Sequence, residues 1–162
     1  MNKLDYHQIQ TIQENTTRKL IKYINEFVKR DKVLDSIEFY YPDFDEQKTK
    51  IAFNVWISID YKTNYGKSFI EHMLEDRSSY LTNLEKEILI ERNKSFVSLF
   101  EIEKIKGENI YILDLLTRKH HTIWDPNMSK HLKPSDLIFS RIGKIIDYEG
   151  FKRGEIEKVQ NE

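Results

Sequence analysis

The second half of the sequence alternates apolar and polar residues over short stretches, and this pattern constrains the fold most. Gly107 and charged residues occupy the positions between the stretches, where turns are expected. The alternation predicts five short β-strands, at Phe96–Ile105, Asn109–Leu116, His120–Trp124, Leu137–Ile142 and Lys144–Tyr148. Because short strands leave many unpaired edges unless the sheet curls, we expect a small antiparallel, β-barrel-like sheet of about five strands.

The first half of the sequence begins with a helical pattern. Apolar residues recur at intervals of three and four from Ile9 to Val28, which predicts an N-terminal amphipathic helix. The opposite face of this helix is basic and carries Arg18 and Lys22. Basic helix faces occur widely as solvated surfaces, and they also bind phosphate groups, so the face is a candidate binding surface.

Two stretches after this helix predict a β-hairpin. Ile37–Tyr41 is short, aromatic and followed by Pro42, which is typical of a strand that ends in a turn. Ile51–Tyr61 places large apolar residues at every second position, so we expect a second strand there. Its other, semi-polar face then carries Asn54, Trp56 and Asp60.

Two short helices follow the hairpin, each with its own start signal. Ser68 and Glu71 have the spacing of a capping box, and so do Thr82 and Glu85. Gly66 precedes the first of them in a turn, where glycine tolerates a positive φ. The sequence therefore predicts an α+β protein with an N-terminal amphipathic helix, a β-hairpin, two short capped helices and the small sheet.

The length of the chain suits one cooperative unit. With 162 residues it has room for a helical and hairpin half at 1–93 and a small β-barrel-like half at 94–150. Residues 151–162 mix both charges without an apolar period, so we expect a frayed tail. No linker-like composition separates the two halves, which indicates a shared core.

Several classes of function are disfavoured by what the sequence lacks. It contains no cysteine, its five histidines have no ligand-type spacing, and its five glycines form no phosphate-binding loop. We therefore expect neither a metal nor a cofactor. A signal peptide and long apolar segments are also missing, so we predict a cytoplasmic protein without membrane association. Its 26 basic and 27 acidic residues create no overall field for nucleic acid.

Part of the chain resembles a bacterial family of uncharacterised proteins. The similarity covers about residues 37–150 and rests on the strings Phe53–Tyr61, Gly66-Lys67-Ser68, Ser98–Ile102, Asp114–Thr117 and Leu132–Ile142. In that family the segment often precedes a Cys-rich, SEC-C-type metal-binding motif, which this chain lacks. The resemblance implies an α+β accessory module. Arg118 and Ser135 replace glycines of the family's turns, so we expect these two turns to be strained or of another type.

The leading functional prediction is a non-enzymatic module that binds another protein. Aromatic residues make up 12% of the chain, and Tyr and Trp are enriched where proteins bind one another. The candidate binding residues are Trp56, Asn54, Asp60, Arg18, Lys22, Trp124 and Arg141. The oligomeric state stays open.

Two other classes of function remain as alternatives. Nucleic acid would bind through the basic helix face and the small barrel, where aromatic and basic residues alternate. A hydrolase would use His121 with Asp60, Asp114 or Asp125, but aspartates at such positions more often hold turns through their side chains.

Overall fold

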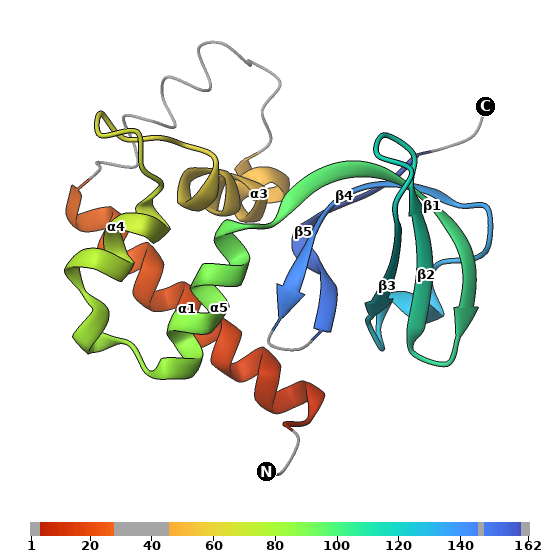
Figure 1. The fold of residues 1–162 in the computed structure, drawn as a ribbon, viewed down its shortest axis with the longest axis horizontal. Coiled ribbons are helices and arrows are strands. Elements are labelled where there is room, and N and C mark those ends of the chain that lie inside the picture. The colour runs from red at the N-terminus through yellow and green to blue at the C-terminus, as the bar shows by residue number, and fades with distance from the viewer. Residues whose placement is uncertain (1–3, 28–45, 146–147, 160–162) are drawn as a thin grey trace. The chain divides into compact units, whose positions relative to one another are not determined.

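The computed structural model describes residues 4–27, 46–145 and 148–159, and the side chains of 4–27 and 53–145 (Figure 1). The chain divides into two compact units, Met1–Asn93 and Lys94–Glu162. Within its described part, the first unit contains four α-helices and a short 3₁₀ helix: α1 (Tyr6–Phe27), α3 (Glu46–Ile59), α4 (Phe69–Asp76), η1 (Ser78–Tyr80) and α5 (Asn83–Asn93). No helix in the described part of the chain is both long and apolar enough to cross a membrane.

The helical unit has a core of its own, to which all four helices contribute. The predicted N-terminal helix is confirmed as α1, which buries one apolar stripe that includes Leu20 and Ile24. Ile57 of α3, Ile70 of α4 and Leu89 of α5 pack into the same cluster. Because α1 buries one stripe, other positions of this helix, which include Arg18 and Lys22, are exposed.

The predicted strand at Ile51–Tyr61 is wrong, because these residues belong mainly to helix α3. Phe53 and Ile57, which we placed on one face of a strand, are four residues apart and share one face of the helix instead. A nearly continuous apolar run fits both periods, and packing against α1 and α4 favours the helix. The other half of the expected hairpin, Ile37–Tyr41, lies outside the described residues.

Both predicted capping boxes are confirmed. In the first, the Glu71 amide donates to Ser68 Oγ at 3.1 Å, and the Ser68 amide donates to Glu71 Oε2 at 2.6 Å. In the second, the amide of Glu85 donates to Thr82 Oγ1, and the amide of Thr82 donates to Glu85 Oε2. The capping boxes satisfy amides that the first turn of a helix cannot pair, so they fix where α4 and α5 begin.

The second unit is a curled antiparallel sheet, a half-barrel of four strands: β1 (Phe96–Lys106), β2 (Asn109–Asp114), β3 (His120–Trp124) and β4 (Leu137–Ile145). β1 pairs with β2 on one side and with β4 on the other, and β3 pairs with β2. Its core contains Phe100, Ile102, Ile112, Ile123 and Ile138, all fully buried. The predicted curled, antiparallel sheet is therefore confirmed.

The last predicted strand differs from the structure: four strands make up the curled antiparallel half-barrel, and Lys144–Tyr148 does not form a separate strand of its own. We expected separate strands at Leu137–Ile142 and Lys144–Tyr148, but β4 runs from Leu137 through Gly143 to Ile145, and Gly143 pairs with Gly150. The backbone of Tyr148–Val159 forms a further strand, β5, beside β4, and meets β3 at one parallel residue pair. It covers most of the expected frayed tail, because an open strand edge binds backbone without requiring apolar side chains.

Two turns of the sheet unit hold non-glycine residues in the left-handed backbone region, as the missing glycines led us to expect. Arg118 has a φ of 62° and Ser135 a φ of 71°. Asp114 Oδ1 holds the first turn by accepting from the amides of Leu116 and Thr117, and it also accepts from Ser98 Oγ.

The second turn has the features of a type II turn. Pro134 stands at its second position, and the Asp136 amide donates to the Lys133 carbonyl at 3.1 Å. Asp136 Oδ2 accepts from the Lys133 amide at 2.9 Å. A type II turn requires a positive φ at its third position. Ser135 occupies this position, and its Cβ makes the conformation sterically less favourable than it would be for glycine.

We expect Ser135→Gly to stabilise the protein by about 0.5–1 kcal/mol, because removal of Cβ relieves the left-handed strain and part of that gain is offset by chain entropy. Ser135→Ala is the matched control, since it removes the hydroxyl but keeps Cβ, and it should give no gain. Urea denaturation of the three proteins measures both effects. If the glycine and alanine variants were equally stable, the conclusion that Cβ strains this turn would be wrong.

Candidate functional site

The helical unit contains a pocket of about 310 Å³ beside the C-terminal end of α1. Its walls come from the end of α1, the segment that follows α3, and α4. The lining residues are Tyr23, Phe27, Tyr61, Thr63, Asn64, Tyr65, Phe69, His72 and Asp76. A volume of this size lies at the lower end of the range for ligand pockets, which suits a single side chain or a small molecule.

Aromatic rings form most of the pocket. Tyr23 and Phe69 are buried, whereas Phe27 and Tyr65 have 59% and 83% of their surface exposed. Tyr61 and Phe69 stack with ring centroids 6.0 Å apart and planes 8° apart. Two buried rings and two exposed rings in one lining give the pocket an aromatic interior that solvent can reach.

The rings also make a continuous series of contacts that reaches α3. Trp56 lies against Tyr61 at 5.6 Å between ring centroids, and Tyr61 stacks on Phe69. His72 then contacts both Phe69 and Tyr65, at 6.4 and 6.0 Å. Trp56, one of the two tryptophans among the candidate binding residues, is therefore connected to the pocket through Tyr61.

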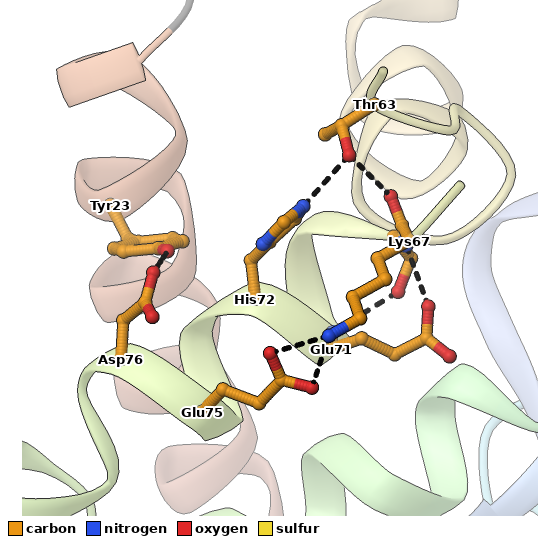
Figure 2. A network of polar contacts seen from close by, with 8 residues as sticks. Tyr23, Thr63, Lys67, Glu71, His72, Glu75 and Asp76 are labelled. Carbon is orange, nitrogen blue, oxygen red and sulfur yellow. Dashed lines mark hydrogen bonds and ion pairs between the residues drawn. The ribbon is translucent and has the colours of Figure 1, made fainter. Parts of the chain in front are cut away.

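A tight turn places the polar group at one side of the pocket. Gly66, with a φ of 72°, donates its amide to the Thr63 carbonyl, and the Thr63 amide donates to the Lys67 carbonyl. Thr63 Oγ1 lies 2.7 Å from His72 Nε2 and 3.2 Å from the Lys67 carbonyl oxygen (Figure 2). When the single hydroxyl proton is donated to that carbonyl, Nε2 is the donor to Thr63.

The other polar group joins α1 to α4. The Tyr23 hydroxyl donates to Asp76 Oδ2 at 2.8 Å (Figure 2). Burial of the ring, together with the hydrogen bond to the Asp76 carboxylate, raises the pKa of Tyr23 well above its ordinary value of 10.0. The phenol therefore stays protonated near neutral pH and remains a donor to the carboxylate.

Two described cations near Asp76 are bound by other carboxylates. Lys67 Nζ lies 2.7 and 2.8 Å from the two carboxylate oxygens of Glu75 (Figure 2), and Arg77 lies 3.0 Å from Glu26 Oε2. The described lining contains the Asp76 carboxylate and neither lysine nor arginine. Apart from the ionisable ring of His72, Asp76 is the charged group among the described lining residues.

The His72 imidazole and the Asp76 carboxylate of the pocket are bound to different residues. His72 and Asp76 share one face of α4, but His72 contacts Thr63 and Asp76 contacts Tyr23. A hydrogen-bonded pair of His72 with Asp76 is not among the described contacts. Among the described residues, no three His, Asp or Glu side chains form a cluster suited to a metal ion.

Comparison with known protein families assigns the chain to a family but gives that family no known activity. A family model described as a family of unknown function, DUF7986, matches residues 1–152. The chain belongs to the DUF7986 family. No curated protein and no solved structure matches the chain. Nothing links the DUF7986 match to SEC-C motifs, so that part of the resemblance drawn from the sequence is not supported.

In this DUF7986 protein, five of the seven candidate residues from the sequence belong to the helical unit. Arg18 and Lys22 are exposed one turn apart on α1, and Trp56 is 37% exposed on α3. Asn54 is half-buried on α3, and Asp60 is exposed directly after it. The basic face of α1 carries less positive charge than expected, because the neighbouring Lys19 is paired with Glu85 at 2.8 Å.

The other two candidate residues lie in the sheet unit and make internal contacts. Trp124 Nε1 donates to Glu108 Oε2 at 2.9 Å. Arg141 is only 3% exposed, and its guanidinium donates to the Ser95 carbonyl at 3.1 Å. The expectation that Arg141 contributes to a binding surface does not agree with this buried position. Alternation in a strand indicates which face a residue lies on, but not whether that face is solvated.

Sequence reasoning missed Tyr23, Tyr65, His72 and Asp76 as site residues. One signal was present, because the predicted cap at Ser68 sets the phase of α4 and so places His72 and Asp76 on one face. Nothing in the local sequence shows that α1 supplies Tyr23 opposite them. Asp114 and Asp125, considered as catalytic carboxylates, instead hold turns: Asp125 Oδ1 accepts from the amides of Asn127 and Met128.

We expect Tyr23→Phe to destabilise the protein by about 1–2 kcal/mol at pH 7–9, because it removes a hydrogen bond to a charged group. The folded-state pKa of Tyr23 is raised above 10.0, so the hydroxyl's contribution is complete below pH 10 and is lost as the pH rises further. The stability difference between the two proteins should shrink above pH 10. Urea denaturation between pH 8 and 11 measures this difference in unfolding free energy. A difference that stays constant over this range would contradict the raised pKa of Tyr23 in the folded protein.

Proposed function

We propose that this DUF7986 protein is a non-enzymatic module that binds another protein, and that the aromatic pocket of the helical unit is its binding site. The observation that carries the proposal is the exposure of Tyr65 and Phe27 around a pocket with buried rings below them. Large aromatic side chains lose solvent at little cost in conformational entropy, which is why they dominate binding energy at protein interfaces.

The surface around the pocket supports a protein rather than a small metabolite as the partner. Trp56 extends the aromatic surface from the pocket onto α3 through its contact with Tyr61. A pocket of about 310 Å³ accepts one side chain, and exposed rings outside it offer contact area that a small molecule would not use. This pattern of one anchored side chain and a surrounding contact surface is common at protein interfaces.

Tyr65→Ala tests the proposal against peptides selected from a random phage-displayed library on the wild-type protein. We expect the variant to bind the selected peptides at least about tenfold more weakly, which corresponds to about 1.4 kcal/mol. Fluorescence anisotropy with labelled peptides measures the affinity.

Tyr80→Ala is the matched control. Tyr80 is also a tyrosine of the helical unit, 68% exposed, but it does not line the pocket. Its loss should change affinity less than twofold, and circular dichroism should show both variants folded. If Tyr65→Ala binds as the wild type does, or if no peptide is selected, the pocket is not the protein-binding site.

Nucleic-acid binding is the second candidate, and exposed Arg18 and Lys22 on α1 favour it. Paired Lys19 and buried Arg141 reduce the number of cations available to phosphates. Titration with labelled single-stranded oligonucleotides at low and moderate salt tests it. Salt-dependent binding that Arg18→Ala and Lys22→Ala weaken would support this alternative, and no binding at low salt would remove it.

A further inference from the structure

We propose that the aromatic pocket binds an alkylammonium group, and that the partner supplies this group as a lysine side chain. The inference rests on the proposed protein-binding function and adds the chemistry that the pocket selects. It follows from the type, the charge and the existing bonds of the lining residues.

The described part of the lining combines π surfaces with one carboxylate. Tyr23, Phe27, Tyr61, Tyr65 and Phe69 contribute aromatic rings, and Asp76 contributes negative charge. The faces of aromatic rings carry negative potential and attract ammonium groups, most strongly where water is partly excluded. A neutral aliphatic side chain would gain only burial from these rings, whereas a cation also gains the attraction of the rings and of Asp76.

Charge in the neighbourhood leaves Asp76 available to an incoming cation. Lys67 is bound by both oxygens of Glu75, and Arg77 is bound by Glu26 while its guanidinium carbon lies 5.8 Å from the centroid of the Tyr80 ring. Among the described contacts, Asp76 is bound by the neutral Tyr23 hydroxyl and by no cation. A bound lysine would therefore complete an ion pair without displacing an existing one.

The hydrogen bond from Tyr23 favours lysine over arginine. Arginine gains its advantage from two parallel hydrogen bonds to both oxygens of one carboxylate. Asp76 Oδ2 already accepts from Tyr23 at 2.8 Å, which leaves Oδ1 as the oxygen with both acceptor sites open to the ligand. A compact ammonium with a flexible four-carbon stem fits a single oxygen and an aromatic wall better than the planar guanidinium does.

The test compares three short blocked peptides, Gly-Lys-Gly, Gly-norleucine-Gly and Gly-Arg-Gly, with choline as a free ammonium probe. Norleucine keeps the apolar stem of lysine and lacks the ammonium. Amide chemical-shift titrations of the full chain report binding at Tyr65, His72 and Asp76. We expect the lysine peptide to bind at least about fivefold more tightly than the norleucine peptide, with arginine and choline weaker than lysine.

Asp76→Asn is the matched variant, because its amide oxygen can still accept from Tyr23 while the charge is gone. We expect it to remove most of the preference for lysine over norleucine and to leave norleucine binding unchanged. A preference that survives in Asp76→Asn at full size would overturn the role of the carboxylate.

Other outcomes separate this inference from the proposed function. Equal binding of lysine and norleucine peptides would overturn the ammonium preference and leave an apolar protein-binding pocket. Arginine binding as tight as lysine, or choline binding tighter, would overturn the choice of lysine. If none of the four probes shifts the pocket amides, the inference fails, whereas Tyr65→Ala with library-selected peptides decides the proposed function independently.

Discussion

The capping box at Ser68 is the interaction on which the arrangement of the pocket depends. It fixes the first turn of α4, and the turn around Gly66 delivers the chain to that point. With the start of α4 fixed, His72 comes within 2.7 Å of Thr63 and Asp76 within 2.8 Å of Tyr23. Both polar groups of the pocket therefore follow from where one short helix begins.

The cap itself is reinforced from outside the helix. Ser68 Oγ donates to Asn93 Oδ1 at 2.7 Å, which ties the start of α4 to the end of α5. The hydrogen bond from the Ser68 amide is the main reason that the pKa of Glu71 is below its ordinary value. Near neutral pH the charged Glu71 side chain therefore keeps the hydrogen bonds of the capping box. The start of α4 is held both by this box and by Asn93 at the end of α5.

Local signals in the sequence were sufficient where the determining contacts are local. The caps at Ser68 and Thr82 and the turn at Gly66 need only residues within a few positions, and all three were predicted. Ile51–Tyr61 was misread because its apolar run fits a strand as well as a helix, and only packing against other helices decides. The pocket was missed for the same reason, since Tyr23 and Asp76 meet across 53 positions of sequence.

In each of the two left-handed turns of the sheet unit, the effect of a substitution at one position depends on the residue at a second position. Arg118 lies in the turn that Asp114 holds, and Ser135 in the turn that Asp136 holds, so each aspartate compensates for a glycine that is not there. Loss of the aspartate is then most harmful while the side-chain-bearing residue remains. Substitution of the aspartate should therefore cost more stability in the present sequence than in a variant with glycine at position 118 or 135, so the effects of the two positions within each turn are not additive.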